Sequence, residues 1–297
     1  MLIKLKDQII NYYKKFMSSK MLGYALSTLS FVYPIFLIYL SWDEIKNIEN
    51  IQITNILLVM GMYLASSIIQ FFNWILILKA NLKASSFDLK IYLQTLLMQR
   101  LPGGFWHWIG RVNLYNQDSN FKSQKAIEAS VFERVALVLT GLSCFLIIWN
   151  LWLGILFVAI VLIIFYYWRK AQHTSIWRRL LYPFAHFSLY MICWLLAGLI
   201  FFVVMKSVNI ENGLPIMQSI SIWALTGSIS LIFFFLPGGL GIKEISLTTL
   251  LLPYITFSQI MLLAVILRLV SLVMDLLISL TGLGLLKTQT QFNKDVL

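Results

Sequence analysis

Two Leu-Pro-Gly-Gly segments, and two arginines inside apolar sequence, are the residues of this chain best suited to chemistry. The segments begin at Leu101 and Leu236, and Arg134 and Arg268 follow the first glycine of each segment by 31 and 30 residues. Pro and Gly end a helix and allow a sharp turn, and the next helix then starts with unpaired N–H groups and a positive dipole end. Phosphate suits such a helix start, and arginine binds phosphate through two parallel hydrogen bonds. The pattern therefore predicts a site for an anionic group.

The charged residues in the apolar sequence after the second segment need partners, because a charged side chain inside a membrane span is costly. Asp275 lies seven residues after Arg268, too far along the helix for a direct pair. We therefore expect Arg268 to have a partner elsewhere, with Glu244 as the candidate. Arg134 is expected to pair with Glu128 or with a residue of the first hairpin. A purely structural role for these pairs is the alternative to ligand binding, and the two roles can coexist.

The aromatic run Trp106-His107-Trp108 follows the first segment. Its residues could line a headgroup cavity, but anchoring at the membrane interface is the favoured interpretation. Glu133 neighbours Arg134 in sequence and is expected to point away from it. His186 lies in an apolar stretch and is expected to be packed rather than catalytic.

The composition around these residues is that of a membrane protein. Of 297 residues, 60% are hydrophobic and only 12% are charged, whereas soluble domains carry about a quarter charged residues. This excludes a soluble globular protein, a disordered one and a nucleic-acid binder. The net charge of +11 is expected mainly in cytoplasmic loops. Cys144 and Cys193 lie in apolar runs, so neither a disulfide framework nor a metal site is indicated, and we expect no cofactor.

Apolar runs and the positive-inside rule predict the topology. The six expected full spans are residues 21–41, 54–78, 126–149, 151–168, 182–205 and 258–286. Residues 1–20 are expected to form a basic amphipathic helix on the membrane surface, and residues 287–297 a cytoplasmic tail. Segments expected inside hold 18 Lys and Arg and 4 acidic residues, against 3 and 5 outside. Both termini are therefore expected in the cytoplasm.

The two Leu-Pro-Gly-Gly segments mark an internal repeat with halves of about 54–168 and 182–286. If each segment is the tip of a re-entrant hairpin, an odd number of crossings separates the halves, and the second half is inverted. The predicted fold class is thus an all-α polytopic membrane protein with six spans and two hairpins. Eight spans are the alternative, in which the hairpin helices cross the membrane. Broken helices that meet near the midplane are typical of transporter sites.

The second half resembles the transmembrane domain of lysylphosphatidylglycerol synthases, a family also called flippase-like. The stretch Pro237-Gly238-Gly239-Leu240-Gly241-Ile242-Lys243-Glu244, followed by Leu267-Arg268-Leu269, is similar to that family's signature. The first half is similar through Leu101-Pro102-Gly103-Gly104, Gly110-Arg111 and Glu133-Arg134. The resemblance covers residues 21–286 as a single domain.

This resemblance implies a multi-pass protein of the prokaryotic cytoplasmic membrane. In full-length synthases the domain is linked to moving aminoacylated phosphatidylglycerol between leaflets, while a separate cytosolic domain transfers the aminoacyl group. We expect no such aminoacyl transferase domain here and no synthase activity. Some stand-alone members accompany glycosyltransferases of envelope or lipid-linked sugar pathways.

We therefore predict an integral membrane protein that translocates or binds an anionic phospholipid or a lipid-linked saccharide. The expected headgroup-binding residues are Pro102, Gly103, Gly104, Arg111, Arg134, Pro237, Gly238, Gly239, Glu244 and Arg268. One alternative is a membrane-embedded partner of an envelope glycosyltransferase, without transport of its own. The other is an intramembrane transferase that acts on a lipid phosphate, although no common catalytic motif is present.

Overall fold

The long apolar runs of the sequence form the long helices of the protein. In the computed structural model, these are α4 (Ile53–Lys79), α7 (Ser123–Trp149), α8 (Leu151–Lys170), α9 (Ile176–Ser207) and α12 (Phe257–Asp295). Each contains a stretch long and apolar enough to cross a membrane, which makes five candidate spans in the described part of the chain. They correspond to five of the six expected spans and indicate a multi-pass membrane protein.

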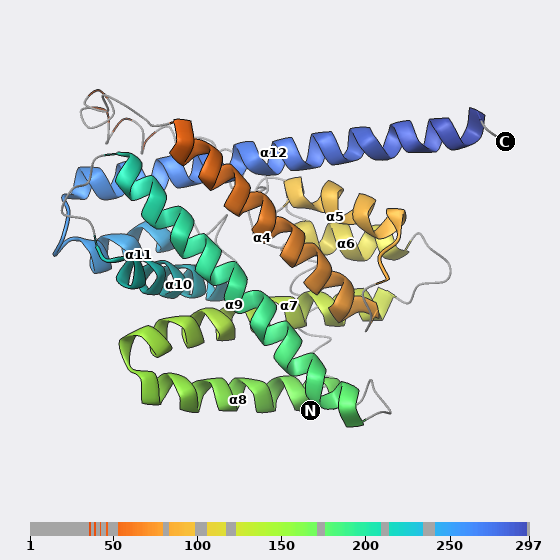
Figure 1. Ribbon diagram of the computed structural model, residues 1–297, viewed down its shortest axis with the longest axis horizontal. Helices are drawn as coiled ribbons and strands as arrows, with labels where there is room; N and C mark the ends of the chain where they lie inside the picture. Colours follow the sequence, from red (N-terminus) through yellow and green to blue (C-terminus); the bar gives the residue numbers. More distant parts are fainter. Residues whose placement is uncertain are drawn as a thin grey trace, which may run out of the picture.

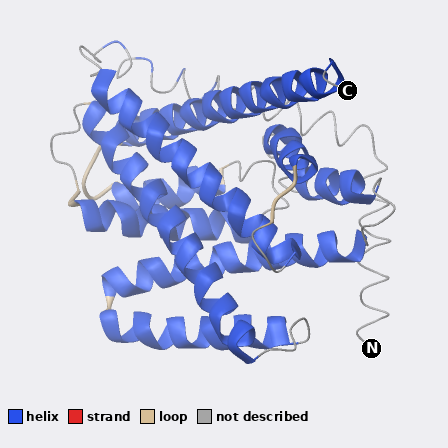
Figure 2. Ribbon diagram, turned by 45° about the vertical axis from the view of Figure 1, so that its right-hand side comes forward, coloured by secondary structure: helices blue, strands red, loops and turns tan. Residues whose placement is uncertain are grey.

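The structure describes residues 36, 39, 42, 46, 53–79, 83–98, 106–116, 123–170, 176–208, 214–233 and 241–295. These residues form helices and the turns between them, with no β-strand among them (Figure 2). The expected surface helix 1–20, most of the expected span 21–41 and both Leu-Pro-Gly-Gly segments lie outside the described residues. Helix α12 continues through most of the expected tail to Asp295, because the sequence has no proline or glycine after Gly284 to end it.

Four shorter helices lie between the long ones: α5 (Ser86–Met98), α6 (Trp106–Asn116), α10 (Ile216–Ile232) and α11 (Ile242–Leu251). They have 13, 11, 17 and 10 residues, fewer than the roughly 20 that span a bilayer. Residues that favour helix starts precede two of them. Pro215 is the N-cap of α10, and Gly241 is the N-cap of α11 with φ of 80°.

The helices form two matched groups, the first helix group (α4 to α7) and the second helix group (α9 to α12). Helix α5 packs on α12 and α10 packs on α7, while α4 packs on α9. The counterparts in the two groups are α4 and α9, α5 and α10, α6 and α11, and α7 and α12. When each helix is replaced by its counterpart, the α5–α12 contact becomes the α10–α7 contact, and the α4–α9 contact stays the same. The contacts α5–α6 and α10–α11 exchange in the same way, as do α6–α7 and α11–α12. The packing is therefore that of a structural repeat.

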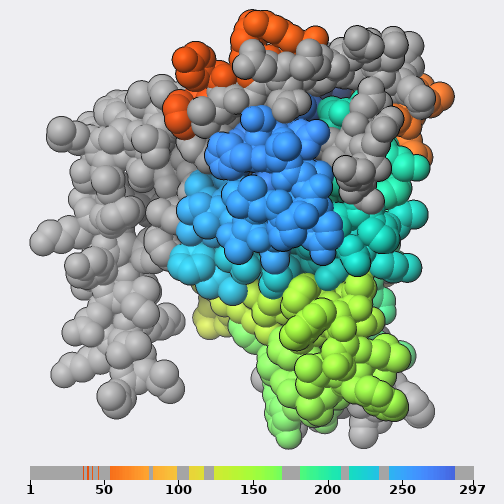
Figure 3. Space-filling model, turned by 90° about the vertical axis from the view of Figure 1, so that its left-hand side faces the viewer, coloured from red at the N-terminus to blue at the C-terminus, as the bar shows by residue number. Residues whose placement is uncertain are grey.

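The matched helices run in opposite directions. In Figure 1, α4 and α9 cross the molecule side by side and antiparallel, and α7 and α12 also have opposite directions. Helices α5 and α6 lie toward the end where α12 finishes, and α10 and α11 lie toward the end where α12 begins. Figure 3 shows the latter end, with the chain from α10 to the start of α12 at its centre and the α7–α8 turn below. The short helices of the two groups thus lie at opposite ends.

Two clusters of buried apolar side chains hold the groups together. One joins α4, α5 and α7 with α8 and α9 around residues such as Trp74 and Phe132. The other joins α9, α10, α11 and α12 around residues such as Phe201 and Leu247. Trp194 of α9 connects the groups: its indole Nε1 donates to the carbonyl of Leu137 at 3.0 Å. Within a bilayer, where lipid tails are as apolar as these side chains, close packing and interhelical hydrogen bonds rather than removal from water hold the helices together.

Candidate functional site

The charge of Arg268 on α12 is paired with Glu244 on α11, as predicted. Nε and Nη2 of Arg268 donate to the same Oε1 atom of Glu244 at 2.9 and 2.7 Å. The other carboxylate oxygen, Oε2, accepts from the backbone N–H of Gly241 at 3.0 Å. Glu244 therefore caps the start of α11 and neutralises Arg268 at once. The pair is nearly closed off, since the Glu244 side chain is 4% exposed and that of Arg268 is 22% exposed.

A second ion pair, which sequence reasoning did not find, lies in the first helix group. Nη1 of Arg111 on α6 donates to Oε2 of Glu133 on α7 at 2.7 Å, and Nε donates to Oγ1 of Thr95 at 3.2 Å. The guanidinium also lies over the ring of Trp74 at 4.3 Å and that of Tyr92 at 5.0 Å. Both charged side chains are buried. The aromatic faces and the carboxylate replace the water that the charge has lost.

The long-helix members of the two ion pairs occupy matching sequence positions, and the charges of the two pairs are exchanged. Glu133 follows Gly103 by 30 residues, and Arg268 follows Gly238 by the same 30 residues. In the first group the arginine is on the short helix and the acid on the long one, and in the second group the reverse holds. The residue of the first helix group that is equivalent to Arg268 in the repeat is therefore Glu133, and not its neighbour Arg134. An alignment of Arg134 with Arg268 places the two halves of the repeat one residue out of register. An arginine and an acid can occupy equivalent positions because an ion pair is kept when its two charges are exchanged.

Arg134 lies beside this first ion pair. Its guanidinium is over the ring of Trp108 at 4.6 Å, so its contact is with the helix that follows the first Leu-Pro-Gly-Gly segment. The other expected partner, Glu128, instead accepts a hydrogen bond from Gln124 at 2.9 Å. Trp108 is half-buried, and its ring carries the guanidinium of Arg134. The side chain of Trp106 lies outside the described residues.

His107 packs against Trp108, with ring centroids 5.4 Å apart. Its Nδ1 atom is buried and has no hydrogen-bond partner among the residues that the structure describes. Burial, together with the positive charges of Arg111 and then Arg134, lowers the pKa of His107 well below its usual value. The imidazole is therefore neutral at neutral pH.

A buried carboxylate at the start of α5 was also missed. The Asp88 side chain accepts hydrogen bonds from the backbone N–H and hydroxyl of Ser85 at 2.7 and 2.6 Å, and from the Tyr115 hydroxyl at 3.1 Å. It also pairs with Lys79 at the end of α4. The Ser85-x-x-Asp88 spacing of a helix-capping box is a sequence signal that could have located it.

Asp275 is fully buried on α12 and accepts a hydrogen bond from the hydroxyl of Tyr63 on α4 at 2.8 Å. One turn further on, Ser279 donates to the carbonyl of Leu93 on α5 at 2.9 Å. These contacts tie α12 to the first helix group. His186 is fully buried as expected, with Nδ1 2.6 Å from the amide oxygen of Asn73.

The predicted site residues therefore divide into three sets. Arg111 and Arg134 come together beside Glu133 in the first helix group, and Glu244 pairs with Arg268 in the second. The hairpin residues Pro102, Gly103, Gly104, Pro237, Gly238 and Gly239 lie outside the described residues. Within the described ranges, no group of three His, Cys, Asp or Glu side chains could hold a metal ion.

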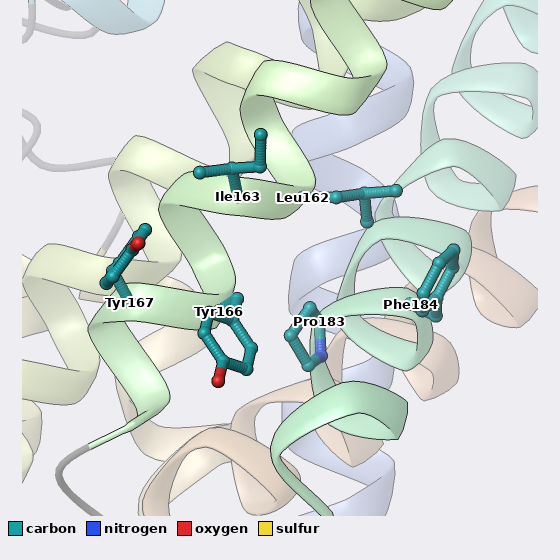
Figure 4. Close-up of a pocket in the computed structure, with 6 residues that line it drawn as sticks. All are labelled: Leu162, Ile163, Tyr166, Tyr167, Pro183 and Phe184. Carbon is teal, nitrogen blue, oxygen red and sulfur yellow. The ribbon is translucent and has the colours of Figure 1, made fainter.

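An apolar groove of about 340 Å³ lies between α8 and α9, away from these charges. Figure 4 shows Tyr166 of α8 facing Pro183 of α9 across it, with Leu162 and Phe184 alongside. Its lining offers little beyond hydrocarbon contact, so it suits an acyl chain and is not a polar site.

Comparison with known proteins gives no relative: no family model, no curated protein and no solved structure matches this chain. The flippase-like resemblance thus depends on the motifs alone.

Proposed function

We propose that this protein binds an anionic phospholipid or a lipid-linked saccharide and carries its headgroup across the membrane. The observation that carries the proposal is the matched pair of buried ion pairs, Arg111–Glu133 and Glu244–Arg268. Each joins a short helix that follows a Leu-Pro-Gly-Gly segment to a long apolar helix. Buried charges are retained in membrane proteins mainly where a polar path or ligand requires them.

The short helices support this proposal as arms of two re-entrant hairpins. They are too short to span the bilayer singly, and they lie at opposite ends of the helix bundle (Figure 1). An inverted pair of broken helices gives two polar entrances, one from each side, that meet between the groups. Such a protein would belong in a prokaryotic cytoplasmic membrane with both termini in the cytoplasm, as the positive-inside rule and the flippase-like resemblance imply.

The direct test is lipid translocation by the purified protein in liposomes. Fluorescent phosphatidylglycerol, a fluorescent lipid-linked saccharide and fluorescent diacylglycerol would each be included, and a membrane-impermeant reductant would then bleach the outer leaflet. We expect the protein to expose the inner-leaflet pool of at least one of the two anionic lipids. Protein-free liposomes report leakage, and diacylglycerol, which crosses unaided, reports complete access.

Bleaching that stops at the outer-leaflet pool for both anionic lipids would refute translocation. Copurification with a glycosyltransferase would then favour the accessory role. Formation of a new lipid product from a lipid phosphate and a donor would favour the transferase role.

A further inference from the structure

Helix α4 is apolar along most of its length, but one side of it is polar. Ser66, Gln70 and Asn73 follow one another at intervals of four and three residues, which places them on the same side of the helix. The side chains of Ser66 and Asn73 are buried. Helix α4 packs beside α9 where the first and second helix groups meet (Figure 1). This polar side is therefore turned into the protein.

Contacts with α9 show what the polar side of α4 faces. The amide oxygen of Asn73 lies 2.6 Å from Nδ1 of His186. One turn later on α9, Tyr190 is 1% exposed and packs in the same apolar cluster as Trp74 of α4. The next residue on that side of α9 is Cys193, whose thiol donates to a backbone carbonyl of α4 at 3.8 Å. Asn73 and Tyr190 thus both lie in the interior at the boundary between the helix groups.

Two polar atoms in this interior have no hydrogen-bond partner among the residues that the structure describes. They are Nδ2 of Asn73 and the hydroxyl oxygen of Tyr190. Buried polar atoms are nearly always hydrogen-bonded, and an unpaired one costs stability. Phenylalanine at position 190 would keep the packing of the ring without that cost. The two unpaired atoms therefore indicate a group that binds there.

The chemistry of these two atoms narrows the choice of that group. An amide NH₂ and a phenol hydroxyl are both neutral, and the hydroxyl can donate as well as accept. A phosphate is better matched by a cation, whereas neutral groups of this kind suit the hydroxyls of a polyol. The Tyr190 hydroxyl also lies within electrostatic reach of the Arg111–Glu133 pair, on which the proposed function depends.

We propose that Asn73 and Tyr190 form a headgroup-binding site at the boundary between the two helix groups, which takes the hydroxyl groups of a glycerol or saccharide headgroup. This inference rests on the proposed function and adds the part of the lipid that the protein recognises. Nδ2 of Asn73 donates to one hydroxyl oxygen, and the Tyr190 hydroxyl bonds to another. Both atoms are enclosed in this arrangement, so the headgroup reaches them when α4 and α9 move apart. Such movement of one repeat against the other, around a site at their boundary, is typical of inverted-repeat transporters.

The test compares phosphatidylglycerol with phosphatidic acid, which has the same phosphate and acyl chains but no headgroup glycerol. Binding to the detergent-purified full chain is measured by native mass spectrometry, with the lipid-linked saccharide of the translocation assay as a third ligand. We expect Tyr190→Phe to weaken binding of phosphatidylglycerol or of the saccharide lipid about fivefold, the loss of one hydrogen bond. Phosphatidic acid binding should not change. A loss for phosphatidylglycerol alone assigns the site to glycerol, and a loss for the saccharide lipid alone assigns it to a sugar.

Thermal unfolding of the delipidated protein gives a second measurement. Tyr190→Phe should raise the melting temperature by about 2–4 °C, because it removes a buried hydroxyl that has no partner. The matched control is Tyr115→Phe, since the Tyr115 side chain is also buried but its hydroxyl donates to Asp88 at 3.1 Å. This control should lower the melting temperature and leave binding of all three lipids as in the wild type. An unchanged or lower melting temperature for Tyr190→Phe would mean that an internal water holds the hydroxyl, and would overturn the inference.

Equal binding of all three lipids by the wild type and Tyr190→Phe would also overturn it. Asn73→Leu is an independent check, because it removes Nδ2 and should weaken binding of the same lipids as Tyr190→Phe while phosphatidic acid binding is kept. Translocation in liposomes tests the proposed function separately. A wild type that translocates lipid while Tyr190→Phe binds it normally would refute only the site. A wild type that binds lipid through Tyr190 without translocating it would refute only the transport.

Discussion

At the scale of single residues, the protein depends on carboxylates and arginines that are buried in pairs. Arg111 and Glu133 are the more enclosed pair, and Glu244 and Arg268 the more accessible one. Burying such a pair adds little net stability, but removing one partner leaves a charge without compensation. The pairs therefore restrict which helices can pack together.

Removing one member of an ion pair should destabilise the protein far more than exchanging the two members with each other. We expect Glu133→Gln or Arg111→Met to lower the free energy of unfolding by about 3–5 kcal/mol. The exchanged variant Arg111→Glu/Glu133→Arg should lose less than either single variant, because the second helix group already uses that order of charges. Thermal unfolding in detergent measures this. An exchanged variant as unstable as the sum of the singles would show that the pair is not interchangeable.

Asp88 makes the stability of the α4–α5 junction depend on pH. Burial raises the pKa of Asp88, but hydrogen bonds from Lys79 and Ser85 outweigh it, and the pKa is lowered from its usual 3.8. A carboxyl with a lowered folded pKa stabilises the protein above its unfolded pKa, and this contribution disappears as pH falls through the folded value. Stability should therefore decrease as the pH is taken below about 3.8.

Asp88→Asn should be less stable than the wild type at pH 6 and should lose less stability on acidification. Unfolding curves recorded from pH 6 to 3 would show the two proteins converging at low pH. Parallel curves at a constant separation would mean that Asp88 is not the group that titrates.

At the scale of elements, helix α11 depends on the glycine at its start. Gly241 precedes α11 with φ of 80°, and its N–H is bonded to Glu244. A side chain in this conformation costs about 1–2 kcal/mol. Gly239 lies two residues earlier, in the predicted hairpin tip, and is expected to be equally intolerant.

Gly241→Ala and Gly239→Val should each reduce lipid translocation, and Gly241→Ala should also lower the unfolding free energy by about 1–2 kcal/mol. Gly61→Ala and Gly61→Val are the matched controls, because an added Cβ there meets no atom within 4 Å. Gly282 of α12 is unsuitable as a control, because an added Cβ there would lie 2.6 Å from Cδ1 of Leu93. The side chain of Leu93 on α5 fills that space. Equal tolerance at Gly241, Gly239 and Gly61 would contradict a strained turn.

At the scale of the whole molecule, the two helix groups are antiparallel, with their short helices at opposite ends (Figure 1). If the bundle spans a membrane, α5 and α11 must face opposite compartments. Lys90 on α5 and Thr249 on α11 are both exposed and can report on this.

On a background without Cys144 and Cys193, which are both buried free thiols, Lys90→Cys should react only with reagents in the cytoplasm. Thr249→Cys should react from the outside, or from a cavity open to it. Labelling by an impermeant maleimide in intact cells and in inverted vesicles measures the difference. Reaction of both cysteines from the same side would refute the inverted arrangement.

The sequence alone determined the membrane character, the five long helices that the structure describes and the Glu244–Arg268 ion pair. Hydropathy and helix-breaking residues act locally, and Glu244 was a candidate because it is the acidic residue next to the second Leu-Pro-Gly-Gly segment. Only the tertiary structure decided that Glu133 pairs with Arg111, that Arg134 stacks on Trp108, and that Asp275 contacts Tyr63. Those contacts join residues on different helices, and their partners follow from how the helices cross. No local pattern encodes that crossing, since it results from the summed packing of apolar faces over the whole bundle.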